Sequence, residues 1–182
     1  VTIPALERGR AKAGKTMEGF EIVGPSFVIT GNNDEEIEKA AIATRKQIAF
    51  YGSTPAYRPV LDMHGWGGLQ DELNTLSKQG EWDKMGTLID DEILNTFAVV
   101  GEPEGIAAEL GARYGDVIQR LSFYAPYASD PDRWAKVMSD LREVCSASSD
   151  SRDLNGTVQF IQGGAIRCRN SSSPRRIRTR SR

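Results

Sequence analysis

Two segments of β-type sequence, separated by a long stretch of helical sequence, constrain the fold of this chain more than any other feature. Residues 20–30 and 117–125 are rich in β-branched and aromatic side chains, which favour strands. Strands that are connected through helices usually lie parallel and are joined by right-handed crossovers. Parallel sheets are normally buried on both faces and contain more than two strands. We therefore predict part of an α/β domain, and we expect its other strands to lie upstream of Val1.

Apolar side chains recur every three or four residues between and after these segments, which predicts amphipathic helices. The clearest stripe begins at Ile37 and ends at Tyr51, and another runs from Trp134 to Cys145. The chain is therefore expected to be helix-rich, with few strands.

Glycine and proline interrupt these patterns at two places. Gly24-Pro25 lies inside the first β-type segment. Because proline has no N–H to donate to a neighbouring strand, we predict a break or bulge there. Residues 65–68 have the sequence Gly-Trp-Gly-Gly, which fits neither the phosphate-loop nor the dinucleotide-binding fingerprint. A plain turn is predicted at that position.

The charge of the chain divides it into two parts. Residues 1–145 carry a net charge of −8 and residues 146–182 carry +6, which together give the overall −2. All eight basic residues of the second part are arginine, and the helical periodicity stops near its start. We therefore predict one α/β domain over residues 1–145. The hypothesis for residues 146–182 is an Arg-rich tail that is disordered or is a non-native extension.

Several classes of protein are disfavoured by composition. Two Cys and one His argue against a disulfide framework and against a zinc site built by the protein. No apolar run approaches the ~18 residues that a membrane span needs, and no signal-peptide pattern begins the sequence. The acidic run at residues 90–92 fits the first turn of a helix better than a metal site. We expect a cytoplasmic protein with no metal and no membrane partner.

A longer motif is more specific than these patterns. The sequence QIAFYGSTPAYRPVLDMHGW, residues 47–66, resembles the C-terminal part of luciferase-like oxidoreductases, especially a branch assigned to a deazaflavin coenzyme. Shorter segments fit the same region at residues 27–31, 89–94, 100–104 and 122–127. The resemblance covers residues 3–144 and stops in the tail.

The resemblance implies a (β/α)8 TIM barrel, of which this chain holds the last two βα units and a helical insertion. Residues 20–30 would form the seventh strand and residues 117–125 the eighth. Since an intact barrel needs ~250 residues, the barrel would be incomplete in this chain. The implied cofactor is coenzyme F420 (8-hydroxy-5-deazaflavin), with FMN as the alternative. The implied reaction is hydride transfer between the reduced coenzyme and a small organic substrate, and the fragment alone is expected to be inactive.

Five residues are candidates for the substrate or cofactor side of a site, and no catalytic residue is assigned. They are Tyr51, Ser53, Tyr57, Arg58 and His64. The first four concentrate hydroxyl groups and a guanidinium at a helix junction, which suits an anionic group. The alternative is a capped junction in which Arg58 pairs with Asp62. His64 could act as a donor or proton relay, or simply bond carbonyls at a helix end.

Two other functions stay open at this point. The apolar stripes could belong to a non-enzymatic helical interaction domain. The arginines of residues 146–182 could bind nucleic acid, although the acidic residues 1–145 argue against that partner. If barrel strands are missing, exposed strand edges and helix faces would favour aggregation or a homo-oligomer.

Overall fold

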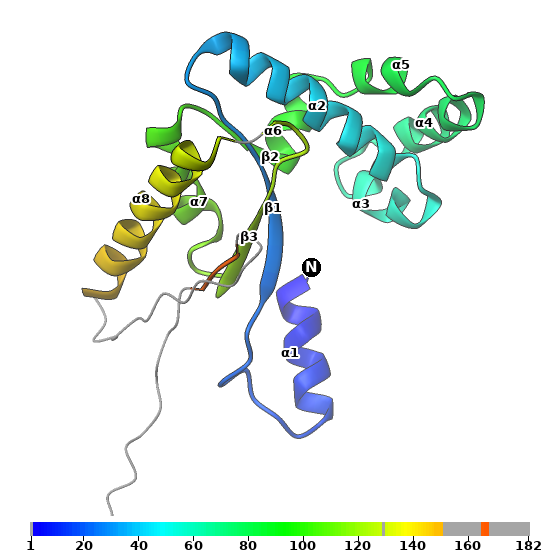
Figure 1. Cartoon of the computed structure of the whole chain (residues 1–182). Helices are drawn as coiled ribbons and strands as arrows, with labels where there is room; N and C mark the ends of the chain where they lie inside the picture. Colours follow the sequence, from blue (N-terminus) through cyan, green and yellow to red (C-terminus); the bar gives the residue numbers. More distant parts are fainter. Residues whose placement is uncertain (1, 129, 151–164, 168–182) are drawn as a thin grey trace, which may run out of the picture.

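The computed structural model describes residues 2–128, 130–150 and 165–167, with side chains up to Val144. The elements are α1 (Thr2–Lys12), β1 (Val23–Ile29), α2 (Asp34–Gly52), the 3-10 helix η1 (Pro55–Tyr57), α3 (Arg58–Asp62), α4 (Gly67–Gln79), α5 (Trp82–Thr87), α6 (Asp91–Phe97), β2 (Ala98–Val100), α7 (Pro103–Tyr114), β3 (Arg120–Tyr124), α8 (Pro131–Asp150) and β4 (Ala165–Arg167). Helices α7 and α8 lie along one face of the strands, and α2 to α5 gather beyond the end of β1 (Figure 1). The predicted tail, residues 146–182, lies outside the described residues except for the end of α8 and β4.

The strands form one sheet in the order β2-β1-β3-β4. Strand β1 is parallel to both β2 and β3, with Phe27 opposite Ala98 on one side and Tyr124 on the other. Strand β4 is antiparallel to β3. The prediction of a helix-rich α/β chain with parallel strands is confirmed. Strand β2 was missed because its three residues are too few to show a strand pattern.

The predicted break at Gly24-Pro25 is wrong, because β1 pairs with β3 in unbroken register from Val23 to Phe27. Just before β1, the Ile22 carbonyl accepts a bond from the Gln119 N–H on the β3 side. Because backbone groups alternate in direction along a strand, the other even-numbered residues of β1 also direct theirs toward β3. The nitrogen of Pro25 therefore faces the opposite side, where β2 does not reach. A proline at this position costs no hydrogen bond to β3.

The prediction of a plain turn over residues 65–68 holds only for its first half. Gly65 has a φ of 79°, a left-handed conformation that glycine adopts without a steric penalty. Gly67 and Gly68 instead begin α4. The apolar stripe that follows them is helical, and its helix ends at Gly80 in the left-handed conformation, as is common at helix C-termini.

The two faces of the sheet are covered unequally. One face packs against α7 and α8 through a buried cluster of Val28, Val99, Ile106, Ala107, Leu110, Leu121, Val137, Met138 and Leu141. The other face is buried by α2, α4 and α6 only near the carboxyl ends of β1 and β2. Toward the start of β1 it is open in the described part of the chain, where Val23 is 55% exposed and Pro25 is also exposed.

Tyr127 completes the hydrogen bonding of β1 where β3 has ended. Its hydroxyl donates to the Val28 carbonyl at 2.7 Å and accepts from the Thr30 N–H at 3.2 Å. These are the backbone groups that a further residue of β3 would have bonded. Burial raises the pKa of Tyr127, so the phenol stays protonated and able to donate at neutral pH.

The first turn of α8 attaches the helix to the loop after β1. The carboxylate of Asp130 accepts from the N–H of Asp132 at 2.9 Å, which caps the helix. The guanidinium of Arg133, only 7% exposed, pairs with Glu36 and donates to the Thr30 carbonyl at 3.3 Å. One buried cation thus joins α8, α2 and the end of β1.

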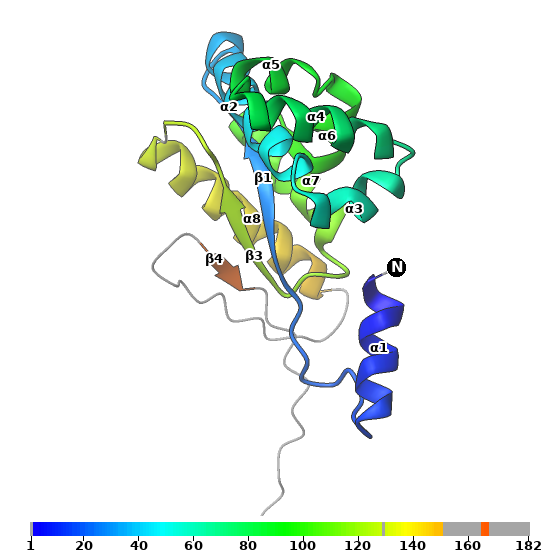
Figure 2. The ribbon, with the colours of Figure 1, turned by 90° about the vertical axis from the view of Figure 1, so that its right-hand side faces the viewer.

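Helix α1 stands apart from the rest of the described chain (Figure 2). It contains no buried residue. Its principal contact is with the loop before β1, where the Arg10 guanidinium lies 5.0 Å from the centre of the Phe20 ring. Among the residues that the structure describes, no helix is both long and apolar enough to cross a bilayer.

Replacing Tyr127 by phenylalanine tests its part in the sheet. The Val28 carbonyl and the Thr30 N–H would both lose their partner inside the protein, and a buried unsatisfied group costs about 1–3 kcal/mol. We expect the free energy of unfolding, measured in urea, to fall by about that amount. Tyr114→Phe is the matched control, since its hydroxyl makes no bond among the described residues. Equal effects of the two substitutions would refute this account.

The cap at Asp130 predicts a pH dependence. Hydrogen bonds from the N–H groups of Asp132 and Arg133, together with the charge of Arg133, lower the pKa of Asp130. The unfolded chain binds this proton near the ordinary pKa of ~3.9, so the ionised cap stabilises the fold above that pH and loses its effect as pH falls through the lower folded pKa. The difference in urea midpoint between the wild type and Asp130→Ala should therefore shrink between about pH 5 and pH 3. Asp132→Ala, in the same turn, should show a smaller dependence.

Candidate functional site

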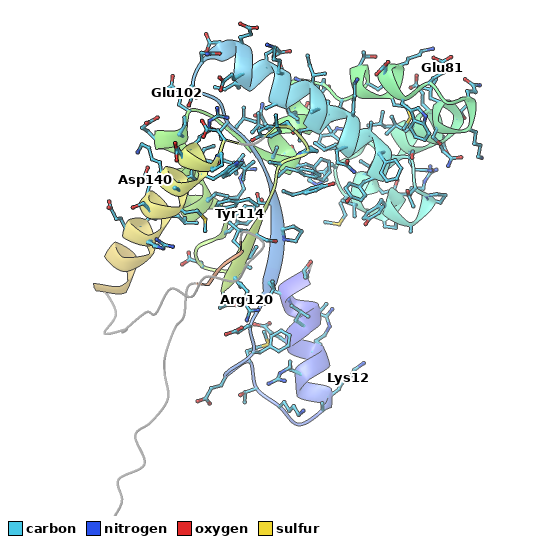
Figure 3. All side chains as sticks on the ribbon, viewed as in Figure 1. Lys12, Glu81, Glu102, Tyr114, Arg120 and Asp140 are labelled. Atoms are coloured by element: carbon cyan, nitrogen blue, oxygen red, sulfur yellow. The ribbon has the colours of Figure 1, made fainter. Side chains whose placement is uncertain are left out.

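The carboxyl ends of the three parallel strands meet at one edge of the sheet. In Figure 3, Glu102, which follows β2, lies at this edge, and Arg120, the first residue of β3, lies at the other. Ligand sites in parallel α/β proteins lie beyond the carboxyl ends of the strands. Two cavities are found there, one apolar and one polar.

The apolar cavity has a volume of about 250 Å³, and we call it the apolar pocket. It lies between the end of β1, the end of α2 and the segment η1–α3. Its lining residues are Phe27, Ile48, Tyr51, Gly52, Tyr57, Val60, Leu61 and Phe97. The structure therefore brings together Tyr51 and Tyr57, two of the five candidates from the sequence.

Four aromatic rings contact one another in a row along this pocket; Phe27, Tyr51 and Tyr57 line it, and Tyr124 extends the row beyond the lining. The ring centres of Tyr124 and Phe27 are 5.0 Å apart, because the two residues are register partners on β3 and β1. The Phe27 ring lies 6.4 Å from Tyr51 at the end of α2, which lies 5.6 Å from Tyr57 on η1. Such tilted and edge-on pairs are favourable geometries for aromatic side chains. Together they form an apolar wall.

The Tyr124 hydroxyl lies beside this wall as a neutral group. Burial, together with the interaction of its side chain with Tyr51, raises the pKa of Tyr124. The phenol of Tyr124 therefore stays protonated at neutral pH. The pair can hold a proton at the edge of the pocket without placing a charge there.

Ser53 does not contribute to the pocket. It is buried, and its hydroxyl donates to the Phe50 carbonyl at 2.7 Å, inside the last turn of α2. Its own carbonyl accepts from Gln70 at 3.1 Å and from Asn74 at 2.9 Å. These bonds tie the end of α2 to α4, so Ser53 holds the helix junction together.

Arg58 is also outside the pocket lining, and its charge is already paired. Its guanidinium lies 2.8 Å from Asp71 and 3.9 Å from Asp62. The hydrogen bond and charge of Asp71 raise the pKa of Arg58. The pairing with Asp62 that the sequence offered as the alternative is present, and Asp71 adds a stronger partner from α4.

His64 lies beyond the end of α3, exposed and beside the pocket wall. Its ring stacks on Trp66 at 4.8 Å with an interplanar angle of 17°, and Phe97 meets it edge-on at 5.8 Å. The backbone N–H of His64 donates to the Leu61 carbonyl at 3.0 Å. Phe97 connects it to the pocket, but His64 itself does not line the cavity.

The sequence alone did not identify Phe27, Phe97 and Tyr124 as site residues. Phe97 and Tyr124 are the last residues of α6 and β3, and Phe27 lies two residues before the end of β1; only the topology brings them together. For Tyr124, the segment at residues 122–127 carried a signal, since an aromatic cluster follows the strand there.

The polar cavity has a volume of about 380 Å³ and is lined by Asn32, Glu36, Lys39, Ala40, Tyr127, Ala128, Asp130 and Arg133. Arg133 is already bonded to Glu36 and lies 3.9 Å from Asp130. Lys39 pairs with Glu35. The charged side chains that line the polar cavity are therefore compensated by neighbouring charges. Nearby, the buried hydroxyl of Thr30 has no partner among the described residues. These residues also include no cluster of three or more acidic, His or Cys side chains suited to a metal.

Comparison with known proteins gives relatives that are longer than this chain. An uncharacterized protein of Mycobacterium tuberculosis is 54% identical over 121 residues, which are 66% of this chain and 36% of the relative. A counterpart in Mycobacterium bovis matches equally. A 5,10-methylenetetrahydromethanopterin reductase of Archaeoglobus fulgidus is 29% identical over 124 residues, which are 64% of this chain and 32% of the relative. The chain thus spans about a third of the length of these relatives.

The family model for luciferase-like monooxygenases matches residues 1–120, from α1 to the first residue of β3. This match includes the motif at residues 47–66 and all eight elements between β1 and β3. The resemblance inferred from the sequence is confirmed, and the chain belongs to the luciferase-like monooxygenase family.

Proposed function

We propose that this chain is the C-terminal part of a luciferase-like (β/α)8 barrel enzyme. In this proposal β1 and β3 are its last two barrel strands, and α2 to α6 are an insertion between them. The enzyme would transfer a hydride between a reduced deazaflavin, coenzyme F420, and a small organic substrate, with FMN as the alternative coenzyme. Family membership supports an oxidoreductase, as does the archaeal relative, which is a reductase.

The observation that carries the proposal is the position of the apolar pocket. It lies beside the carboxyl end of β1, next to Tyr124 at the end of the parallel strand β3. Barrel enzymes place their active sites beyond the carboxyl ends of their strands. Its wall is aromatic and its lining uncharged. A water-poor, apolar surface suits hydride transfer, because water would compete for the reactants and would screen the electrostatic interactions that stabilise the transition state.

The fit of a flavin-like coenzyme to these residues is partial. Either coenzyme carries a phosphate, and the described residues that line the pocket include no cation to hold it. We therefore propose that the other strands of the barrel hold the coenzyme. The aromatic, apolar wall formed by Phe27, Tyr51 and Tyr57 would instead face the substrate.

Within the site, this chain would position and protect the reactants. When bound, the coenzyme supplies the hydride chemistry. Tyr57 and Val60 would exclude water at the mouth of the pocket, and the Tyr51–Tyr124 pair would keep a proton on a phenol oxygen at its edge. The open part of the sheet beside Val23 would be covered by strands corresponding to the two thirds of the relatives that this chain does not match.

The test uses the protein encoded by the complete reading frame that contains this chain. This complete protein should oxidise reduced deazaflavin, or reduced FMN, in the presence of a substrate. Residues 1–182 alone should show no turnover. In the complete protein, Tyr57→Ala should lower kcat/KM about tenfold, because it removes roughly 1–3 kcal/mol of apolar contact.

Trp82→Ala is the control, since Trp82 is an equally exposed aromatic residue on α5 that does not line the pocket. It should leave kcat/KM unchanged. The proposal is wrong if the complete reading frame adds no barrel strands, or if its product oxidises neither reduced coenzyme. Turnover by residues 1–182 alone would equally contradict it.

A further inference from the structure

We propose that the apolar pocket binds a neutral, hydrocarbon-like ring of the substrate that carries few oxygens, all of them uncharged. The substrate would then be neither phosphorylated nor carboxylated at the end that enters the pocket. This inference deepens the proposed function and rests on it. It is carried by the charges, the polar atoms and the size of the pocket.

The lining of the pocket offers nothing to an ionised group. Of its eight residues none is charged, and the only side-chain polar atoms are the hydroxyls of Tyr51 and Tyr57. An ionised carboxylate or phosphate that is removed from water without a partner pays a large desolvation cost. The lining therefore selects against anionic groups.

The nearest cation strengthens this selection. Arg58 lies on α3 beside the lining residues Tyr57, Val60 and Leu61, but Asp71 and Asp62 both accompany its guanidinium. The charge of Arg58 is therefore already compensated. It does not supply the attraction for an anionic ligand that the sequence first suggested.

The polar atoms limit the number of oxygens that the ligand can carry. The hydroxyls of Tyr51 and Tyr57 are the polar atoms of the lining side chains. A hydroxyl or carbonyl on the ligand can bond to one of them. Every further polar group on the ring would be buried against Phe27, Ile48 or Phe97 without a partner.

The size of the pocket fits one ring system. Its volume of about 250 Å³ is below the ~300–1,000 Å³ that is typical for larger, drug-sized ligands. Tyr57 and Val60 at its mouth are 44% and 40% exposed. Substitutions at these two positions should therefore alter binding without disturbing the buried core.

The experiment compares two probes that share one bicyclic ring. Binding of 2-naphthol, which is neutral, and 2-naphthoate, which is anionic, is measured on residues 1–182 by ligand-observed NMR at neutral pH. We expect 2-naphthol to bind at least about tenfold more tightly, a difference of ~1.4 kcal/mol. Val60→Asp should weaken 2-naphthol binding about tenfold or abolish it.

Ile42→Asp is the matched control, because Ile42 is a branched apolar residue on α2 with 46% exposure that lies outside the lining. It should leave binding unchanged, and circular dichroism confirms that both variants fold. Tyr57→Phe gives a second readout, since it should weaken 2-naphthol but not naphthalene.

Equal or tighter binding of 2-naphthoate overturns the inference, as does unchanged 2-naphthol binding in Val60→Asp. Failure of this inference can be distinguished from failure of the proposed function. If the complete protein oxidises the reduced coenzyme but residues 1–182 reject 2-naphthol, the ligand class is wrong and the activity stands. If 2-naphthol binds as expected but no reduced coenzyme is oxidised, the proposed activity fails.

Discussion

The hydroxyl of Tyr127 stands in for a strand residue beside the end of β1. It satisfies the Val28 carbonyl and the Thr30 N–H together, so β3 can end at Tyr124 without leaving buried backbone groups unpaired. The chain is then free to turn into α8, whose Arg133 bonds the Thr30 carbonyl. Because β3 ends there, the ring of Tyr124 lies at the rim of the sheet beside Phe27. The aromatic wall of the pocket thus depends on how β1 is completed.

Charged and apolar surfaces are kept apart at this edge of the sheet. The buried guanidinium of Arg133 has two carboxylates near it and serves the polar cavity. Arg58 likewise has two carboxylates near it, Asp62 on α3 and Asp71 on α4. Since both cations are compensated by carboxylates, the field that they produce inside the apolar pocket is weak. The hydroxyls of Tyr51 and Tyr57 are the only polar atoms among the side chains of its lining.

The sequence predicted the helices better than it predicted the site, for physical reasons. The stripe from Ile37 to Tyr51 reports a buried helical face directly, and α2 follows it closely. Strand β2 is too short to show a pattern, and it is seen only through its pairing with β1. Pro25 was misread because the direction of its missing N–H depends on which edge of β1 carries a partner.

The candidate site shows the same limit. Tyr51 and Tyr57 were found because one local motif holds both, and adjacent helices bring them together. Phe27, Phe97 and Tyr124 come from elements far apart in the sequence, so their meeting follows only from strand order and register. For Arg58, the sequence suggested an anion site, but Asp71, thirteen residues later on α4, takes that role. A long-range partner decided what a local cluster could bind.

The free side of β1 carries a further constraint on how the sheet can extend. Odd-numbered residues of β1 direct their backbone groups to this side, where β2 pairs only from Phe27 onward. Before that point the edge offers the N–H of Val23 and the carbonyls of Val23 and Pro25, but Pro25 has no N–H to give. A strand added here by chance would lose a ladder hydrogen bond, which weakens edge-to-edge aggregation. In the proposed barrel, a strand beside β1 would instead gain its stability from the apolar face around Val23 and Phe27.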